Sequence, residues 1–208
     1  MSLAENLEQG IAELGLHVPA ATQCKLLDYL VLITKWNRVH NLTAVRESAR
    51  MVSDHLLDCI AVVPHLDART VLDVGSGAGL PGIPIALMRP QSSVTLLDSN
   101  HKKAAFLRQA TIELGLKNAQ VVCERVESWQ FQGEFELVIS RAVSDLPEFL
   151  KLAGRLCAAD GTVAAMKGLY PHEELAQLPG GFNLRGVIPL KVPGMGAQRH
   201  LVLLKPVR

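Results

Sequence analysis

The first third of the chain carries its large apolar residues at helical spacing. Spacings of three and four residues separate four of them, which are Leu26, Leu30, Ile33 and Trp36. Side chains at these spacings line one face of an α-helix, so the pattern predicts a helix that starts at Pro19. A further helix is expected from Ser48, a suitable N-cap residue, to Val63, just before a proline. Residues 1–67 are therefore expected to form a helical extension packed on a core.

From Arg69 onward the pattern changes to short β-rich runs that alternate with helical stretches. Five runs fit, and they read TVLDVG, SVTLLDS, AQVVCERV, ELVISRAV and GTVAAMKG. Strands joined through helices form right-handed crossovers and a parallel sheet. The final runs, NLRGVIPLKV and RHLVLLKP, are joined by a loop too short for a helix, so they should pair antiparallel. Residues 68–208 are expected to form an α/β, Rossmann-like domain with a mainly parallel sheet that ends in an antiparallel hairpin.

Composition narrows the class of protein. The chain has 208 residues, of which 49% are hydrophobic, enough for one α/β domain with an extension. No apolar run approaches the roughly 18 residues of a membrane span, and acidic residues interrupt the N-terminus. We expect neither a membrane segment nor a secretory signal. The four cysteines are far apart and form no Cys-x-x-Cys pair, which favours reduced thiols in a cytoplasmic protein and argues against a zinc site.

Charge is distributed unevenly along the chain. The formal net charge is only +1, which is not the charge of a basic nucleic-acid arm. Residues 1–67 hold five Lys and Arg against eight Asp and Glu, a net of −3, whereas residues 137–208 hold nine against five, a net of +4. The C-terminal part could face a phosphate backbone, although a solvated basic face is the alternative interpretation.

A glycine-rich turn follows the first predicted strand in the segment VLDVGSGAGLPGIPIAL. The stretch from Gly77 to Gly82 fits Gly-x-Gly-x-x-Gly, and Asp98 follows about twenty residues on, as in dinucleotide-binding folds. Pro81 and Pro84, however, remove N–H donors that a pyrophosphate would use in the first helical turn. The turn is therefore a poor match to a dinucleotide site.

A cofactor without phosphate suits the turn better. The acid-x-Gly-x-Gly-x-Gly spacing of Asp73, Gly75, Gly77 and Gly79 resembles the first motif of class I S-adenosylmethionine-dependent methyltransferases. Asp98, at the end of the second predicted strand, has two carboxylate oxygens that suit both ribose hydroxyls. The terminal antiparallel hairpin also resembles that class. A phosphate or dinucleotide loop stays the alternative.

The ends of the third and fourth predicted strands should border the same crevice, since carboxyl ends of parallel strands meet at one edge of a sheet. Val126 could pack beside the adenine, while Glu127 or a neighbouring amide reads its edge. The alternative for Glu127 is a surface position at a helix start. Arg141 lies near the end of the fourth run, where an arginine needs an anionic partner to offset its desolvation.

The type of methylation is narrowed by residues that the chain lacks. SRAVSD, after the fourth run, has no Asn or Asp followed by Pro-Pro and an aromatic residue, as amino methylation of adenine would use. Methylation at cytosine C5 needs a nucleophilic cysteine. We expect Cys157 inside a helix and Cys123 inside the third strand, both as core thiols. Clustered carboxylates for a metal-dependent site are also missing. A nucleophile with a free lone pair, such as guanine N7, needs no general base and no catalytic side chain, only alignment with the methyl group.

Seven stretches together resemble one bacterial family over nearly the whole chain. They are TKWNRVHNLTAVRE, HLLDCIAVVPHL, LDVGSGAGLPGIPIAL, LLDSNHKKAAFLRQ, VVCERVESW, VISRAVSDL and RHLVLLK. The family is the ribosomal RNA small subunit methyltransferase G family, also called glucose-inhibited division protein B. The resemblance implies methylation at N7 of one guanine in 16S ribosomal RNA, with S-adenosylmethionine as cofactor and the small-subunit RNA or the small ribosomal subunit as partner.

The resemblance also implies site residues. The expected cofactor contacts are Gly75, Leu80, Val126, Glu127 and Arg141. Asp98 matches the ribose-binding acid of the wider methyltransferase class, and Gly77 is expected to border the cofactor.

Four residues at strand ends are candidates for RNA contacts, and they are Arg125, Lys167, Arg199 and His200. Trp36 is expected in the core, while Asn37 and Asn41 are expected to hold the KWNRVHNLTAV segment over the cofactor or the entering base. A lone histidine beside a strand, such as His200, is more often structural.

Three alternatives stay open at this point. The chain could be a methyltransferase for a small molecule or a protein, which its near-neutral charge permits. It could be a dinucleotide-dependent oxidoreductase, or a ribosome-assembly module that binds the cofactor without turnover. We expect a monomer.

Overall fold

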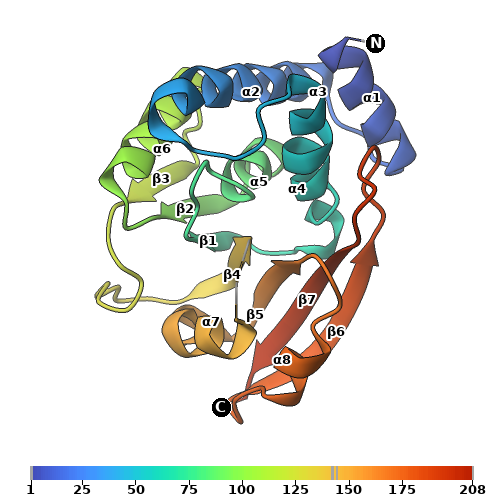
Figure 1. The fold of residues 1–208 in the computed structure, drawn as a ribbon. Coiled ribbons are helices and arrows are strands. Elements are labelled where there is room, and N and C mark those ends of the chain that lie inside the picture. Colours follow the sequence, from blue (N-terminus) through green and yellow to red (C-terminus); the bar gives the residue numbers. More distant parts are fainter. Residues whose placement is uncertain (1, 142, 144, 208) are drawn as a thin grey trace.

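A seven-stranded sheet forms the centre of the molecule (Figure 1). The computed structural model describes residues 2–141, 143 and 145–207. The strand order is β3-β2-β1-β4-β5-β7-β6. The strands are β1 Thr70–Val74, β2 Ser93–Leu97, β3 Ala119–Val122, β4 Phe135–Arg141, β5 Cys157–Lys167, β6 Phe182–Leu190 and β7 Arg199–Pro206. β1 to β5 pair in parallel, and β7 pairs antiparallel with both β5 and β6. The predicted sheet and terminal hairpin are confirmed.

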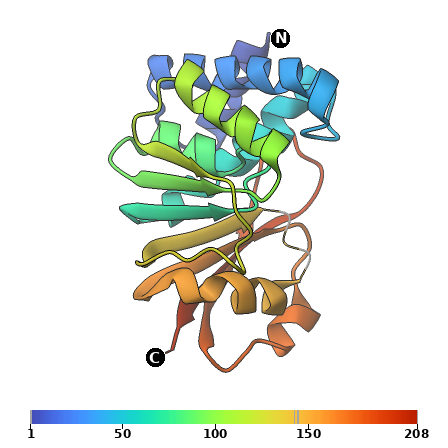
Figure 2. The ribbon, with the colours of Figure 1, turned by 90° about the vertical axis from the view of Figure 1, so that its left-hand side faces the viewer.

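Helices cover both faces of the sheet (Figure 2). The helical elements are α1 Leu3–Glu13, α2 Ala20–His40, α3 Ser48–Met51, η1 Val52–Leu57, α4 Asp58–Ile60, η2 Val63–His65, α5 Gly82–Met88, α6 His101–Glu113, α7 Leu146–Ala153, η3 Gly154–Leu156 and α8 His172–Ala176. The helices of the extension lie with α5 and α6 on one face, and α7 and α8 lie on the other. Each face has its own hydrophobic cluster. The predicted boundary between residues 67 and 68 stays a prediction, and the extension shares one core with α5 and α6.

The expected helix from Ser48 to Val63 consists of four segments with three kinds of winding. It begins as α3, continues as a π-helix in η1, returns to α-helix in α4 and, after a short break, ends as a 3₁₀ turn in η2. The apolar spacing predicted the helical region, but spacing alone does not distinguish an α-turn from a π-turn, which adds one residue. The extra residue changes which backbone carbonyls have helical partners.

The structure corrects the prediction for Cys157, which begins β5 instead of lying in a helix. It pairs with Phe135 of β4 and is fully buried. The short apolar run around it suits a buried helix as well as a buried strand, which explains the error. Cys123 follows β3 directly and is only half-buried, with its Sγ 3.3 Å from His101 Nδ1, so it is not the core thiol we expected.

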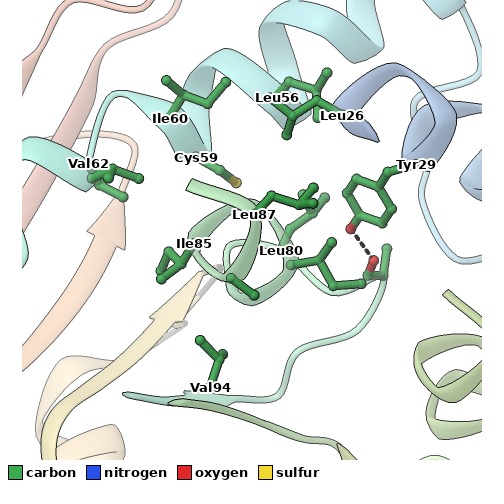
Figure 3. Packing of buried hydrophobic residues seen from close by; sticks show 14 of the residues in the cluster. Leu26, Tyr29, Leu56, Cys59, Ile60, Val62, Leu80, Ile85, Leu87 and Val94 are labelled. Atoms are coloured by element: carbon green, nitrogen blue, oxygen red, sulfur yellow. Dashed lines mark hydrogen bonds between the residues drawn. The ribbon is translucent and has the colours of Figure 1, made fainter. Parts of the chain in front are cut away.

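Tyr29 of α2 connects the extension to the turn after β1 (Figure 3). Its ring is fully buried near Leu26, Leu56 and Leu80, and its hydroxyl donates a hydrogen bond to the Ala78 carbonyl. Burial raises the pKa of Tyr29 well above its ordinary value, which keeps the hydroxyl protonated as a donor. The extension therefore helps to fix the glycine turn.

Within the parts of the chain that the structure describes, no helix combines the length and the apolar character needed to span a bilayer.

Candidate functional site

The glycine turn between β1 and α5 exposes its backbone. Gly75 and Gly77 have φ of +69° and +60°, a left-handed conformation that glycine adopts without strain. The amides of Gly75 and Ser76 donate to the Leu97 carbonyl at 2.8 and 3.0 Å, which ties the turn to the end of β2. Among the residues that the structure describes, a Cβ at Gly75 would meet no atom within 4 Å, and one at Gly77 would meet only the Gly75 carbonyl oxygen at 3.8 Å. A ligand can therefore approach this part of the turn closely.

Gly82, by contrast, is packed closely against Leu96 and Asp73. A Cβ at Gly82 would collide with the Leu96 side chain and with the carboxylate of Asp73. The Gly82 amide donates to Asp73 Oδ2 at 3.0 Å, so the acid at the end of β1 holds the first turn of α5. The first glycines of the motif thus leave open space for a ligand, whereas Gly82 allows close packing within the protein.

Asp73 is fully buried, and burial raises its pKa to about 7 against the favourable hydrogen bonds from Ser76 and Gly82. Its Oδ1 has no hydrogen-bond partner among the described residues. In the sequence, Asp73 only marks the start of the glycine motif. At this buried position, the ionised Asp73 carboxylate lowers the stability of the folded state.

We expect the stability of the protein to fall as the pH rises through the range in which Asp73 ionises. Between its ordinary pKa of 3.8 and about 7, the folded state binds a proton that the unfolded state has released. The unfolding free energy should therefore fall by up to about 1.4 kcal/mol per pH unit in this range and level off above it. Asp73→Asn should remove this fall while its amide oxygen still accepts from Gly82.

Urea unfolding of both proteins at pH 5 and pH 7.5 measures this effect. Other carboxyl groups titrate in the wild type and the variant alike, so the difference between the two proteins isolates Asp73. An equal loss of stability in both would contradict the assignment.

One pocket, of about 310 Å³, lies at the ends of β1, β2 and β3. We call it the glycine-turn pocket, and it is lined by Val74, Gly75, Leu97, Asp98, Ser99, Lys103, Glu124, Arg125, Val126 and Glu127. It brings together four residues that the sequence predicted for the cofactor: Gly75, Asp98, Val126 and Glu127. Arg125, which we predicted for RNA, lines the same pocket.

Asp98 is the buried acid of this pocket. Its Oδ2 accepts from the Gly77 amide and its Oδ1 from the Asn100 amide, both at 2.8 Å. Each oxygen keeps a second lone pair, so the carboxylate is fixed in orientation and still able to accept from a diol. Leu80, predicted as a contact, is buried in the core that the extension shares with α5, and it does not line the pocket.

A second pocket, of about 230 Å³, lies where β4, β5 and β7 meet. We call it the basic pocket, and it is lined by Asp58, Arg141, Met166, Lys167, Gly168 and Arg199. Arg141 pairs with Met166 in the sheet, and Lys167 pairs with His200. Because β7 runs antiparallel to β5, its first residues lie beside the last residues of β5. The structure thus places Arg141 with Lys167 and Arg199, residues predicted for RNA, and not in the glycine-turn pocket.

Asp58 of α4 joins two of these cations. Its side chain is 2% exposed, Oδ1 accepts from Arg199 Nε at 3.0 Å, and Oδ2 lies 3.5 Å from Arg141 Nη1. Burial raises the pKa of Asp58, and the two arginines act in the opposite direction. Sequence reasoning missed this residue, although a lone acid inside the apolar run HLLDCIAVV was a usable signal.

Lys167 and His200 have structural partners. Lys167 Nζ donates to the Val143 carbonyl at 2.9 Å and forms an ion pair with Glu174 at 2.7 Å. His200 Nδ1 lies 2.8 Å from the Gly168 carbonyl oxygen, so this nitrogen carries the proton and donates. Arg199 likewise has an ion pair, with Asp58, and donates Nη1 to the Gln198 carbonyl at 3.1 Å.

The Asn37 side chain holds the segment that follows α2. Its Oδ1 accepts from the Thr43 amide at 3.0 Å, and the Thr43 hydroxyl lies 2.9 Å from His55 Nε2 in η1. Asn41 ends α2 in a left-handed conformation, with φ of +48°. Trp36 is half-buried and packs on Phe106. These contacts fix the segment to η1, next to the helix that carries Asp58.

Comparison with known proteins identifies the family. The family model GidB, described as rRNA small subunit methyltransferase G, matches residues 22–202. The chain belongs to this family. The protein named Ribosomal RNA small subunit methyltransferase G from Nitrosospira multiformis is 56% identical over 99% of this chain and 98% of its own length. The protein of the same name from Laribacter hongkongensis is 55% identical over 98% of this chain and 99% of its own.

Solved structures confirm the fold of this methyltransferase G family member. The mitomycin 7-O-methyltransferase MmcR has a TM-score of 0.63 at 17% identity, covering 76% of this chain and 56% of its own. The O-methyltransferase TomG from Streptomyces achromogenes, solved in complex with SAM, has a TM-score of 0.59 at 16% identity, covering 87% and 90%. At such identities the likeness concerns the fold, which is that of class I S-adenosylmethionine-dependent methyltransferases.

Proposed function

We propose that the chain transfers a methyl group from S-adenosylmethionine to N7 of one guanine in 16S ribosomal RNA. Membership of the methyltransferase G family over residues 22–202 carries this proposal. The small molecule, protein and dinucleotide alternatives have no comparable support, because curated relatives along the whole chain have the ribosomal RNA name.

The glycine-turn pocket fits the cofactor. Gly75 and Gly77 leave open space in front of the turn backbone, and Asp98 has fixed oxygens for a ribose diol. Val126 and Glu127 lie in the same pocket and would flank the adenine. When bound, the cofactor supplies a methyl group on a positively charged sulfur.

The task of the protein in this reaction is alignment. A guanine N7 has a free lone pair, so no side chain has to remove a proton before the methyl group moves. The glycine turn and Asp98 orient the cofactor, and Arg199 of the basic pocket holds the RNA, so the chain contributes binding and orientation. We assign no catalytic acid or base.

The partner, the location and the oligomeric state are part of the same proposal. We propose that the chain acts as a monomer on the small ribosomal subunit or its RNA, in the cytoplasm. The net charge of +4 in residues 137–208 supports contact with RNA. The wide separation of the four cysteines supports a reducing compartment.

Methyl-labelled S-adenosylmethionine tests the function directly. The protein is incubated with free 16S RNA or with whole small subunits, both from cells that lack this enzyme, and the labelled nucleotide is mapped. Label on a single N7-guanine is expected. Cofactor binding without label on either substrate would favour a non-catalytic module or another methyl acceptor.

A further inference from the structure

The proposed methylation of guanine N7 requires an unpaired base. N7 lies on the major-groove edge of guanine. In an RNA double helix this groove is deep and too narrow for side chains to enter. An enzyme that methylates N7 therefore acts on a guanine that is unpaired or has left its stack. Unpaired bases in RNA complexes commonly stack on aromatic side chains of the protein. An exposed aromatic ring near the site is thus the feature to look for.

One exposed aromatic ring lies just beyond β5. The chain has two Trp, two Tyr and five Phe residues, and among those that the structure describes Tyr170 is the most exposed, at 40%. It follows the end of β5 at Lys167, after Gly168 and Leu169, and Leu169 is 74% exposed. Because β1 to β5 are parallel, this end of β5 lies at the same edge of the sheet as the glycine-turn pocket.

Two histidines fix the position of the Tyr170 ring. The His172 ring lies 4.3 Å from it between centroids, at an interplanar angle of 38°, and the His200 ring meets it edge to face at 5.7 Å and 84°. His200 is itself held, because its Nδ1 donates to the Gly168 carbonyl at 2.8 Å and it pairs with Lys167 in the sheet. The ring is therefore placed before a ligand binds, which lowers the entropic cost of binding.

A cation lies beside the same loop. Arg199 lines the basic pocket together with Gly168, and a Cβ at Gly168 would lie 3.6 Å from Arg199 Nη1. The guanidinium group is thus close to the loop that carries Tyr170, and its side chain is 27% exposed. A positive group for the backbone and an aromatic ring for a base are the two parts of a site for single-stranded nucleic acid.

We propose that Tyr170, held by His172 and His200, is a stacking platform for an unpaired base of the RNA substrate. This inference rests on the proposed function and deepens it, because it names a residue that receives a base.

Tyr170→Ala removes the platform. We expect kcat/KM for methylation of small subunits to fall about tenfold or more, the effect of losing one stacked base. Calorimetry with S-adenosylmethionine should be unchanged, because Tyr170 does not line the glycine-turn pocket. The slope of log affinity for RNA against log salt should also keep its wild-type value, because stacking releases no counterions. The unchanged slope separates stacking from a phosphate contact.

Three further variants separate stacking from other roles of the side chain. Tyr170→Phe and Tyr170→Trp keep an aromatic face, so both should retain kcat/KM within about threefold of the wild type. Loss of the hydroxyl should matter little, because no described residue forms a hydrogen bond with it. Tyr170→Leu keeps an apolar side chain without a ring, and it should be as defective as Tyr170→Ala.

Leu184→Ala is the matched control for loss of exposed apolar surface. Leu184 is 42% exposed, close to the exposure of Tyr170, and it pairs with Leu204 in β7, away from Arg199. The variant should keep kcat/KM within about twofold of the wild type. Thermal unfolding of each variant shows whether it is folded, and if Tyr170→Ala is not, the comparison of Tyr170→Leu with Tyr170→Phe decides the question.

The outcomes are distinct. Wild-type kcat/KM in folded Tyr170→Ala, a lower salt slope or a loss of cofactor affinity in that variant would each overturn the inference. Wild-type kcat/KM in Tyr170→Leu would also overturn it and would indicate an apolar contact with protein instead. If the wild type labels no guanine N7, the proposed function itself fails, whereas a negative result confined to the Tyr170 variants leaves the proposed function intact.

Discussion

Gly77→Asp is expected to abolish detectable binding of S-adenosylmethionine while the protein still unfolds cooperatively. The Gly77 amide donates to Asp98 Oδ2 at 2.8 Å, so a carboxylate at this position would stand beside the acid assigned to the ribose. It would occupy ligand space and repel Asp98. The fold should tolerate the change, because a Cβ meets only one atom of the described part of the chain, at 3.8 Å, and aspartate adopts a positive φ more readily than most residues. Isothermal calorimetry and thermal unfolding measure the two parts.

Gly77→Ala separates backbone strain from the effect of the carboxylate. Alanine at a φ of +60° costs about 1–2 kcal/mol of stability but adds no charge and little volume. Cofactor affinity should fall less than about tenfold in this variant. Binding that is retained by Gly77→Asp would show that the turn does not border the cofactor, whereas equal loss in both variants would attribute the effect to backbone strain and not to the carboxylate.

Most of the sheet was predictable because its hydrophobic pattern depends on local sequence. Apolar runs separated by helical stretches predicted β1 to β5, and the short loop before Arg199 predicted the antiparallel pair. The π-turn was not predictable, because the spacing of apolar residues does not show to which carbonyl each backbone amide donates its hydrogen bond. The start of β5 at Cys157 was missed because a buried helix and a buried strand look alike over a few residues.

The candidate site was predictable only where its residues come from the carboxyl ends of neighbouring parallel strands. Asp98 and Val126 follow strands whose carboxyl ends meet at one edge, so a parallel sheet brings them together. Asp58 comes from the extension, and its contact with Arg141 depends on how α4 packs on the sheet. Packing of that kind has no local pattern. The assignment of Arg141 to the cofactor, which the resemblance implies, stays a prediction, and its position beside Arg199 could not be read from the sequence.

Arg199→Ala is expected to lower kcat/KM for methylation of small subunits about a hundredfold, with cofactor affinity changed less than twofold. The change removes a guanidinium that lines the basic pocket and leaves Asp58 with Arg141 as its remaining ion-pair partner. A lost charge-assisted contact to phosphate, together with the disturbed neighbour, supports an effect of this size. The glycine-turn pocket does not include Arg199, so calorimetry with S-adenosylmethionine should be unaffected.

Salt dependence identifies the partner of Arg199 as a phosphate. If the guanidinium neutralises one backbone phosphate, Arg199→Ala should reduce the slope of log affinity for RNA against log salt by about 0.7 to 0.9. Arg185→Ala is the control, because Arg185 is exposed on β6 and contacts Thr162 in the middle of β5. Its neighbours Leu184 and Gly186 pair with Leu204 and Leu203, several residues along β7 from Arg199. Arg185→Ala should keep the wild-type slope and kcat/KM. Equal loss of methylation and cofactor affinity in Arg199→Ala would instead place this arginine on the cofactor side, where its pairing with Asp58 would serve a different ligand.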